Sequence, residues 1–181
     1  MRVITGTARG MTLRTLEGDD VRPTTDRVKE AMFSIVQFDL EGRRILDLFA
    51  GSGQLGIEAL SRGAKSATFV DRDKAAIAVI KENIGKTGFE KQAAVVQTDA
   101  FSFLRMTADT FDIVFLDPPY STGMLQKTLA DLDDCVALGG TVVCEMPYGE
   151  EMPETEGNLK LYRTYKYGKI GLAIYRKENE E

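Results

Sequence analysis

The clearest indication of the fold class is the sequence Asp47-Leu48-Phe49-Ala50-Gly51-Ser52-Gly53-Gln54-Leu55-Gly56. It begins within an apolar run, residues 45–49, and leads into a helical pattern at residues 55–62. Glycines at such a turn let the backbone pass close beneath a ligand held at the N-terminus of the following helix. A strand, a glycine turn and a helix in that order are typical of the first unit of a nucleotide-binding α/β domain.

Downstream of this turn, short apolar β-type runs alternate with helical patterns, which predicts βαβ units on a parallel sheet. The expected strands are residues 45–49, 67–70, 93–97, 112–116 and 141–145, and the expected helices are residues 55–62, 74–87, 100–106 and 122–135. Residues 159–167 and 170–176 predict two further strands joined by Tyr167-Gly168-Lys169. We therefore expect a Rossmann-like α/β fold, a mainly parallel seven-stranded sheet with an antiparallel C-terminal hairpin.

The first 40 residues are expected to form an extension of this body, so the chain divides into residues 1–40 and 41–181. Residues 2–5 and 11–15 flank a glycine-containing turn and predict a β-hairpin. An amphipathic helix follows, for which Thr25 or Asp26 is a natural N-cap.

Three acids stand at three successive expected strand ends: Asp47, Asp71 and Asp99. An acid about twenty residues after a G-x-G-x-x-G turn is suited to bind ribose hydroxyls. The glycine turn together with Asp71 therefore also fits a nicotinamide-dependent enzyme. Asp47 would repel a pyrophosphate but suits an ammonium group. Asp99, with Ala100 beside it, is placed to meet an adenine amino group, although it also fits a helix N-cap. The three acids together favour S-adenosylmethionine, which leaves as S-adenosylhomocysteine. The expected contacts at these strand ends are Asp47, Phe49, Ala50, Gly51, Gly53, Asp71, Arg72, Asp99 and Ala100.

A second turn, Asp117-Pro118-Pro119-Tyr120, follows the apolar strand expected at residues 112–116. Two successive prolines cannot continue a central strand, so the chain leaves the sheet in a stiff, extended turn. The Asp117 carboxylate and the Pro118 carbonyl then become fixed acceptors, and the Tyr120 ring becomes a stacking platform. Two acceptors aimed at the two hydrogens of an exocyclic amine favour a pyramidal nitrogen with its lone pair turned toward a methyl donor. These four residues are the catalytic candidates.

Composition narrows the chemistry further. Histidine is absent, which excludes Ser-His-Asp and Cys-His catalysis and removes the commonest zinc ligand, so no metal is expected. Cys135 and Cys144 have no Cys-x-x-Cys spacing, and we expect both to be buried small hydrophobes, not nucleophiles.

Basic residues concentrate at the two ends of a chain whose net charge is −5. Arg2, Arg9 and Arg14 stand among residues 1–15 without an acid, and residues 160–177 hold six basic residues without an acid. Lys166 and Lys169 belong to this second group. If both ends fold to one side, they provide a surface for a nucleic acid, although such charge runs are also common on solvated faces.

The 181 residues, 43% of them hydrophobic, suit one compact domain with a small appendage. No stretch approaches the roughly 18 apolar residues that a membrane span requires, and the N-terminus lacks the apolar run of a signal peptide. We expect a cytoplasmic protein, and a monomer, with no membrane partner.

Beyond the two turns, the N-terminal sequence resembles one family. Several stretches are similar throughout to the RsmD family of class I methyltransferases: residues 2–6, Gly10, Leu13, residues 22–33 with their Arg22-Pro23-Thr24-Thr25-Asp26-Arg27 segment, residues 46–53 and residues 55–64. The resemblance covers nearly the whole chain and implies methylation of N2 of guanine 966 of 16S rRNA in the small ribosomal subunit. It also implies that Thr24 and Arg27 lie across the methionine end of the cofactor, next to the Asp117 turn, with Arg22 among the RNA contacts.

Other functions remain open on the sequence alone. The same fold could act on adenine N6 or another RNA or DNA base amine, or on a protein glutamine. The absence of a separate target-recognition domain weighs against sequence-specific DNA. A nicotinamide oxidoreductase and a non-catalytic RNA-binding module are the alternatives from other classes.

Overall fold

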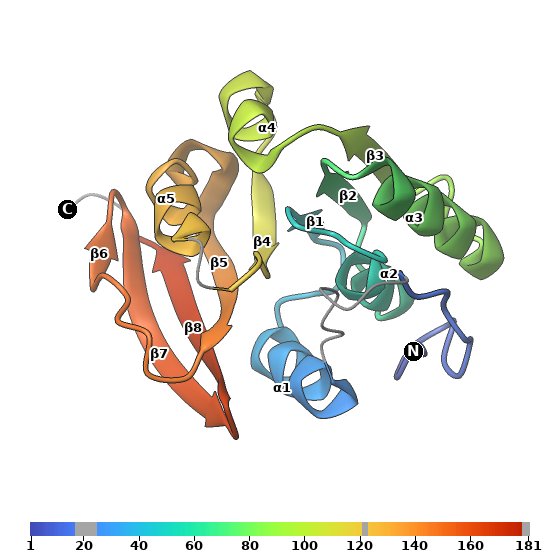
Figure 1. Ribbon diagram of the computed structural model, residues 1–181, viewed down its shortest axis with the longest axis horizontal. Coiled ribbons are helices and arrows are strands. Elements are labelled where there is room, and N and C mark those ends of the chain that lie inside the picture. The colour runs from blue at the N-terminus through green and yellow to red at the C-terminus, as the bar shows by residue number, and fades with distance from the viewer. Residues whose placement is uncertain (17–24, 121–122, 179–181) are drawn as a thin grey trace.

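The computed structural model describes residues 1–16, 25–120 and 123–178 (Figure 1). Its helices are α1 (Asp26–Val36), α2 (Gln54–Ser61), α3 (Lys74–Thr87), α4 (Ala100–Met106) and α5 (Met124–Ala130), with the 3₁₀ helix η1 (Asp133–Cys135). Its strands are β1 (Arg44–Asp47), β2 (Ser66–Asp71), β3 (Ala93–Gln97), β4 (Phe111–Leu116), β5 (Val136–Pro147), β6 (Thr155–Glu156), β7 (Leu159–Tyr167) and β8 (Ile170–Lys177). The expected α/β order is confirmed.

The described strands form one sheet in the order β3-β2-β1-β4-β5-β8-β7-β6. Strands β1 to β5 run parallel, and β8 pairs with β5 in the antiparallel direction. The sheet has eight strands where seven were expected, because the two-residue strand β6 adds to the edge of β7. So short a strand carries no periodic signal in the sequence.

Helices cover both faces of the sheet. Apolar side chains of α1, α2 and α3 pack with one face in a cluster that includes Phe33, Ile57, Ile80 and Phe115. Side chains of α4 and α5 pack with the other face around Phe103 and other buried apolar residues. The carboxyl ends of the parallel strands therefore meet at one edge between the two helical layers, which is where open α/β sheets bind ligands. None of the described helices is long and apolar enough to cross a membrane.

The expected N-terminal β-hairpin is confirmed in a shorter form than residues 2–5 and 11–15 predict. Within the described residues, the segments form a single antiparallel bridge between Arg2 and Thr12. The Val3 and Leu13 amides donate across the hairpin to the Met11 and Met1 carbonyls, each at 2.9 Å. Beyond Val3 the chain turns toward α2, where the Ile4 and Thr5 amides donate to the Glu58 carboxylate at 2.8 and 2.9 Å, so these two donors are not available to lengthen the hairpin.

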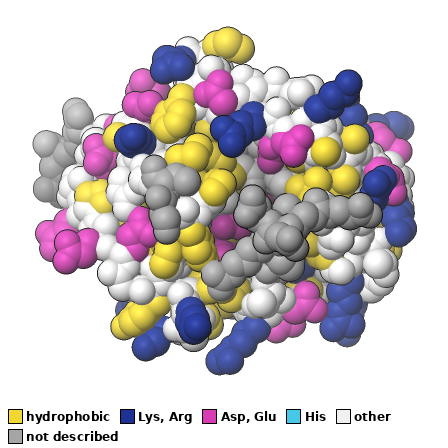
Figure 2. Space-filling view, in the orientation of Figure 1, with side chains coloured by type: hydrophobic (Ala, Val, Ile, Leu, Met, Phe, Trp, Pro, Cys, Tyr) yellow, Lys and Arg dark blue, Asp and Glu magenta, His cyan; other side chains and the backbone are white. Residues whose placement is uncertain are grey.

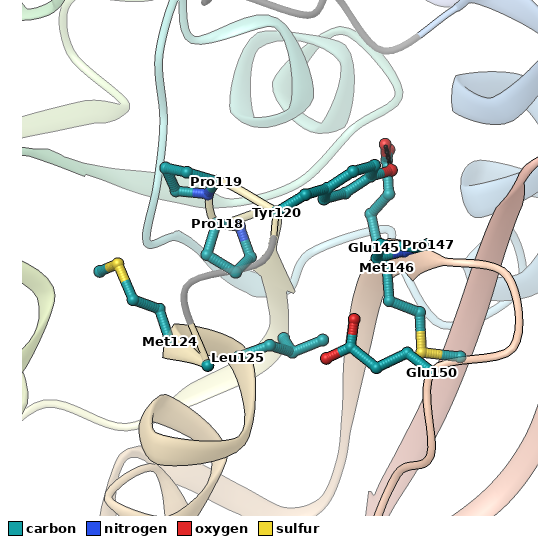
Figure 3. Close-up of a pocket in the computed structure, with 10 residues that line it drawn as sticks. Pro118, Pro119, Tyr120, Met124, Leu125, Glu145, Met146, Pro147 and Glu150 are labelled. Carbon is teal, nitrogen blue, oxygen red and sulfur yellow. Dashed lines mark hydrogen bonds between the residues drawn. The ribbon is translucent and has the colours of Figure 1, made fainter.

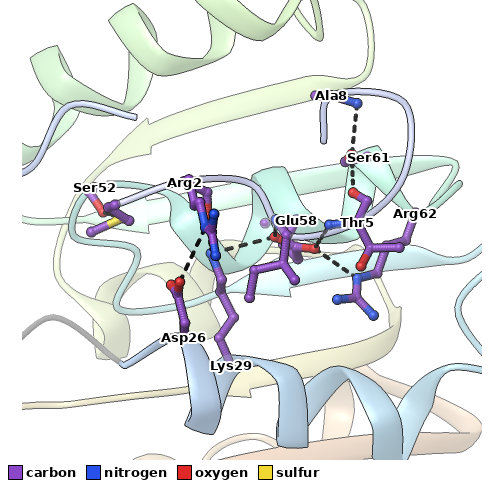
Figure 4. Close-up of polar contacts among 12 residues, drawn as sticks. Arg2, Thr5, Ala8, Asp26, Lys29, Ser52, Glu58, Ser61 and Arg62 are labelled. Carbon is purple, nitrogen blue, oxygen red and sulfur yellow. Dashed lines mark hydrogen bonds and ion pairs between the residues drawn. The ribbon is translucent and has the colours of Figure 1, made fainter. Parts of the chain in front are cut away.

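A buried ion pair fixes this junction (Figure 4). The Lys29 ammonium lies 3.5 Å from Glu58 and donates to the Arg2 carbonyl at 2.6 Å, and both charged side chains are fully buried. Burial lowers the pKa of Lys29, although the Glu58 carboxylate opposes that shift. Arg62 donates to the same carboxylate at 2.9 Å, so α1, α2 and the N-terminal segment share one set of charges.

Candidate functional site

The glycine turn between β1 and α2 has the geometry that its sequence predicts. Gly51 and Gly53 have φ values of 54° and 80°, and Gly53 is the N-cap of α2. A Cβ atom at Gly51 would meet nothing within 4 Å, so the backbone there borders open space. The turn can therefore accept a ligand against its backbone at the N-terminus of a helix.

Asp47 ends β1 directly before this turn and is buried, with 2% of its surface exposed. Its Oδ2 atom accepts a hydrogen bond from the Gly56 amide at 3.0 Å. Burial raises the pKa of Asp47 to about 7, the Gly56 hydrogen bond opposes the shift, and the Asp71 charge adds to it. A buried acid that titrates near neutrality gains most from a cationic partner, because the ion pair replaces the lost hydration.

Asp71 and Asp99 occupy the next two strand ends, as expected. Asp71 accepts from the Gly51 amide at 2.9 Å, which ties the end of β2 to the glycine turn. Asp99 is exposed and caps α4 by accepting from the Ser102 amide at 3.0 Å. Hydrogen bonding from the Ser102 side chain, and then from the Ser102 amide, lowers the pKa of Asp99. Asp99 thus performs the capping role that its sequence position allowed, while its carboxylate remains open to solvent.

The residues at these strand ends fit an amino-acid nucleoside. Three carboxylates offer acceptors for ammonium, hydroxyl and amine hydrogens. Gln54 adds a further acceptor, since its buried Oε1 atom has no hydrogen-bond partner within the described part of the chain. The site would hold the ligand along the glycine turn from Asp47 toward Asp99.

The second turn lines an open, shallow hollow at the carboxyl ends of β4 and β5 (Figure 3). Pro118 is buried, Pro119 is exposed, and Asp117 and Tyr120 are half-buried. Tyr120 and both prolines line the hollow from the β4 side. The remaining lining residues are Gly123, Met124, Leu125, Glu145, Met146, Pro147 and Glu150.

Glu145 is a residue of this site that the sequence reasoning missed. It lies in β5, is 3% exposed, and accepts a hydrogen bond from the Tyr120 hydroxyl at 2.8 Å. The hydroxyl is thereby anchored, which limits the rotation of the ring that closes one wall of the hollow. The available signal was an acid at the end of the apolar run 141–145, the same pattern that marked Asp47 and Asp71.

The other residues predicted for the cofactor site differ in their exposure to solvent. Phe49 is half-buried and Ala50 and Ala100 are buried near the strand ends, whereas Arg72 is exposed. Arg27 is exposed in the first turn of α1. Thr24 and Arg22 lie outside the described residues.

The predicted RNA-binding residues do not form a single cluster. Arg2 and Arg14 are exposed and pair with Asp26 and Glu82, at 3.4 and 2.6 Å. Arg9, Lys166 and Lys169 are also exposed. Figure 2 shows Lys and Arg side chains along the lower border of the face that also carries a central band of hydrophobic side chains.

Both cysteines are buried and free, as expected. Burial raises the pKa of each thiol, so neither supplies a thiolate at neutral pH. The described residues contain no group of three or more potential metal ligands.

A mainly parallel sheet with a glycine turn and acids at its carboxyl edge, beside an Asp-Pro-Pro-Tyr turn, is the arrangement of a class I S-adenosylmethionine-dependent methyltransferase. The comparison with family profiles narrows this class. The profile described as "Conserved hypothetical protein 95" matches residues 1–176. The chain belongs to this family, which is the RsmD family of the sequence resemblance.

Individual relatives cover the chain almost end to end. The putative rRNA methyltransferase YlbH of Bacillus subtilis is 44% identical over 98% of this chain and 99% of its own. Ribosomal RNA small subunit methyltransferase D of Escherichia coli K12 is 35% identical over 98% of this chain and 90% of its own. The structure of the putative methyltransferase yhhF from Escherichia coli superposes with a TM-score of 0.88 at 35% identity, covering 99% of each chain.

Proposed function

We propose that this chain transfers a methyl group from S-adenosylmethionine to the exocyclic N2 amine of a guanine in 16S rRNA, guanine 966 by the family resemblance, within the small ribosomal subunit. The hollow carries the proposal, because Pro118, Pro119 and Tyr120 line it at the end of β4, and β4 pairs directly with β1, which leads into the glycine turn. A relative 35% identical over almost the whole chain is named as a methyltransferase of small-subunit ribosomal RNA, which supports the substrate.

The protein's own contribution would be positioning. Asp117 and the Pro118 carbonyl accept the two amine hydrogens, which turns the nitrogen lone pair toward the methyl group. Tyr120 stacks on the base, and its bond to Glu145 holds the ring at a fixed angle. S-adenosylmethionine, when bound, supplies a methyl group already activated for displacement. No side-chain base is needed for the attack, since the proton can leave after transfer.

Asp47, Asp71 and Asp99 are the proposed contacts to the ammonium, the ribose hydroxyls and the adenine amine of the cofactor. Phe49, Ala50, Gly51 and Gly53 would pass beneath it, with Arg72 and Ala100 beside it. Residues 1–40 would form an extension that contacts RNA and cofactor, and the protein would act as a monomer without a metal. A base in folded RNA must be splayed out of its stack before it reaches such a hollow.

Small ribosomal subunits isolated from cells that lack the modification provide the test. The protein is incubated with them and with methyl-labelled cofactor, and the rRNA is digested to nucleosides for mass spectrometry. The label is expected in N2-methylguanosine at one position. Label in N6-methyladenosine would reassign the base, and label in ribosomal protein would reassign the substrate class. Asp117→Ala should abolish transfer, whereas a non-catalytic RNA-binding module would not depend on this residue for its function.

A further inference from the structure

The C-terminal hairpin β7–β8 carries an alternating series of guanidinium groups and phenol rings on one face. The Arg176 guanidinium lies 4.0 Å from the centre of the Tyr162 ring, and the Arg163 guanidinium lies 5.8 Å from the same ring. Arg163 also lies 5.9 Å from the Tyr165 ring. We call these four residues the arginine–tyrosine ladder.

The strand register places the ladder on the sheet face that α1 covers elsewhere. Tyr165 pairs with Leu172 and Arg163 pairs with Ile174, and both partners belong to the apolar cluster around α1. Directly paired residues project to the same face of a sheet. The register shift between Leu161 and Arg163 inserts Tyr162 as an extra residue, which brings its ring between the two guanidinium groups.

The ladder begins beside the hollow. Leu172 pairs with Tyr165 on one side and with Glu145 on the other, and Glu145 lines the hollow. Tyr165 therefore stands two strand spacings, about 10 Å, from Glu145 in the same row. From that row the ladder extends along the strands to Arg176 in β8, which pairs with Thr141 in β5.

The two guanidinium groups of the ladder have no acidic partner among the described residues. Residues 160–177 hold six basic residues and no acid in a chain of net charge −5. Lys160 and Lys177 pair with Glu178 and Asp133, but within the described residues neither Arg163 nor Arg176 forms an ion pair. Tyr162 is 54% exposed, so its ring is accessible to a partner.

We propose that the arginine–tyrosine ladder is the surface that holds the single-stranded RNA flanking the target base, by stacking bases on Tyr162 and Tyr165 and neutralising phosphates with Arg163 and Arg176. The proposal rests on the proposed RNA substrate and adds the path that the RNA takes. Exposed sheet faces with aromatic rings stack unpaired bases in other RNA-binding folds, and every base has a face that can stack. Alternating positive charge between the rings selects a polyanionic strand over an apolar partner.

Tyr162→Ala tests the stacking, with Tyr162→Phe as the matched variant that keeps the ring. Binding of a fluorescent single-stranded RNA copied from the proposed target region is measured by anisotropy over a series of KCl concentrations. Tyr162→Ala is expected to weaken binding by about 5- to 150-fold, while Tyr162→Phe stays close to the native protein. The double variant Arg163→Ala/Arg176→Ala should flatten the slope of log affinity against log salt by about 1.4.

Controls separate the ladder from general charge and from folding. Lys86→Ala removes an exposed positive charge from α3, at the other end of the sheet, and should leave binding unchanged. Each variant should bind S-adenosylhomocysteine like the native protein and melt at a similar temperature. Methylation of unmodified small subunits should fall for Tyr162→Ala and be retained for Tyr162→Phe.

If Tyr162→Ala binds RNA and methylates small subunits as well as the native protein does, the proposed RNA-binding role of the ladder is overturned, while the proposed function stays intact. Loss of self-association in that variant, with RNA binding unchanged, would assign the face to a second copy of the chain and also overturn it. Binding of polyglutamate by the native protein and its loss in Tyr162→Ala, again with RNA binding unchanged, would assign the face to an acidic protein and would also overturn the proposal. If the native protein methylates no rRNA, the proposed function fails, and the anisotropy series still decides whether the ladder binds RNA.

Discussion

Asp47→Asn is expected to remove a pH dependence of cofactor binding that the native side chain imposes. Asp47 is buried, and its pKa is raised to about 7 in the protein without ligand. If the carboxylate meets the ligand's ammonium group, only its ionised form binds well. Affinity should then rise as the pH rises through 7 and level off above pH 8.

The size of the effect follows from that pKa. At pH 6 about one tenth of the Asp47 side chains are ionised, and at pH 8 about nine tenths are, so the affinity should differ about tenfold. At pH 7 binding should release about half a proton per site. The charge of Asp71 contributes to the raised pKa of Asp47, so Asp71→Asn should shift the midpoint to lower pH while keeping the dependence.

Isothermal titration calorimetry with S-adenosylhomocysteine measures both quantities, in two buffers of different ionisation heat at each pH. Any titration of the ligand's own amine appears equally in Asp47→Asn, so the difference between the two proteins isolates the carboxylate. The same pKa makes the folded protein bind more protons than the unfolded chain between about pH 4 and pH 7. The unliganded native protein should therefore gain about 1 kcal/mol of unfolding free energy from this group when the pH falls from 8 to 6, and Asp47→Asn should not. Equal affinity of the native protein at pH 6 and pH 8 would refute the role of Asp47.

Three further substitutions test the site and its support. Tyr120→Phe should lower kcat/KM by about tenfold or more through the lost bond to Glu145, and combining it with Glu145→Leu should cost no more than Glu145→Leu alone; additive losses in single-turnover assays would contradict the shared role. Lys29→Met should lower the free energy of unfolding in urea by about 3–5 kcal/mol, because the buried Glu58 carboxylate loses its partner. Adding Glu58→Gln should recover part of that loss, and no recovery would contradict the role assigned to the buried charge of Glu58. Gly6→Ala places a Cβ atom 1.7 Å from a backbone carbonyl of α2 at a φ of 87°, so it should cost at least about 2 kcal/mol and expose the N-terminal segment to proteases; native resistance would contradict this contact.

Much of the fold was predictable because its signals are local. The helices Lys74–Thr87 and Ala100–Met106 were predicted to the residue, since Asp73 and Asp99 cap their starts. The strand expected at residues 141–145 begins earlier, at Val136. In the sequence, Gly139 and Gly140 indicate a turn, but in the structure the strand continues through them, with an irregular register against β4.

The errors arise where a partner lies far away in sequence. The N-terminal hairpin is shorter than predicted because beyond Val3 the Ile4 and Thr5 amides bond to Glu58 and not to the opposite arm. The helix expected at residues 122–135 ends at Ala130 and gives way to a 3₁₀ turn at Asp133–Cys135. Asp133 there accepts from Asn158 and pairs with Lys177, contacts with the C-terminal strands that periodicity cannot reveal.

The candidate site divides in the same way. Asp47, Asp71 and Asp117 could be predicted because each follows an apolar strand, and parallel strands bring their carboxyl ends together. Glu145 required the structure, since its role depends on the hydroxyl of Tyr120, which comes from a different strand end.

The anchoring of the N-terminal segment has a consequence for the order in which the chain assembles. Residues 1–16 are synthesised first, yet the carboxylate that receives the Ile4 amide lies 54 residues later. The segment can form its own hairpin bonds early, but it cannot dock before α2 has been synthesised. The Lys29–Glu58 ion pair also requires α2, so α1 and the N-terminal segment depend on the same later helix for their charged contacts.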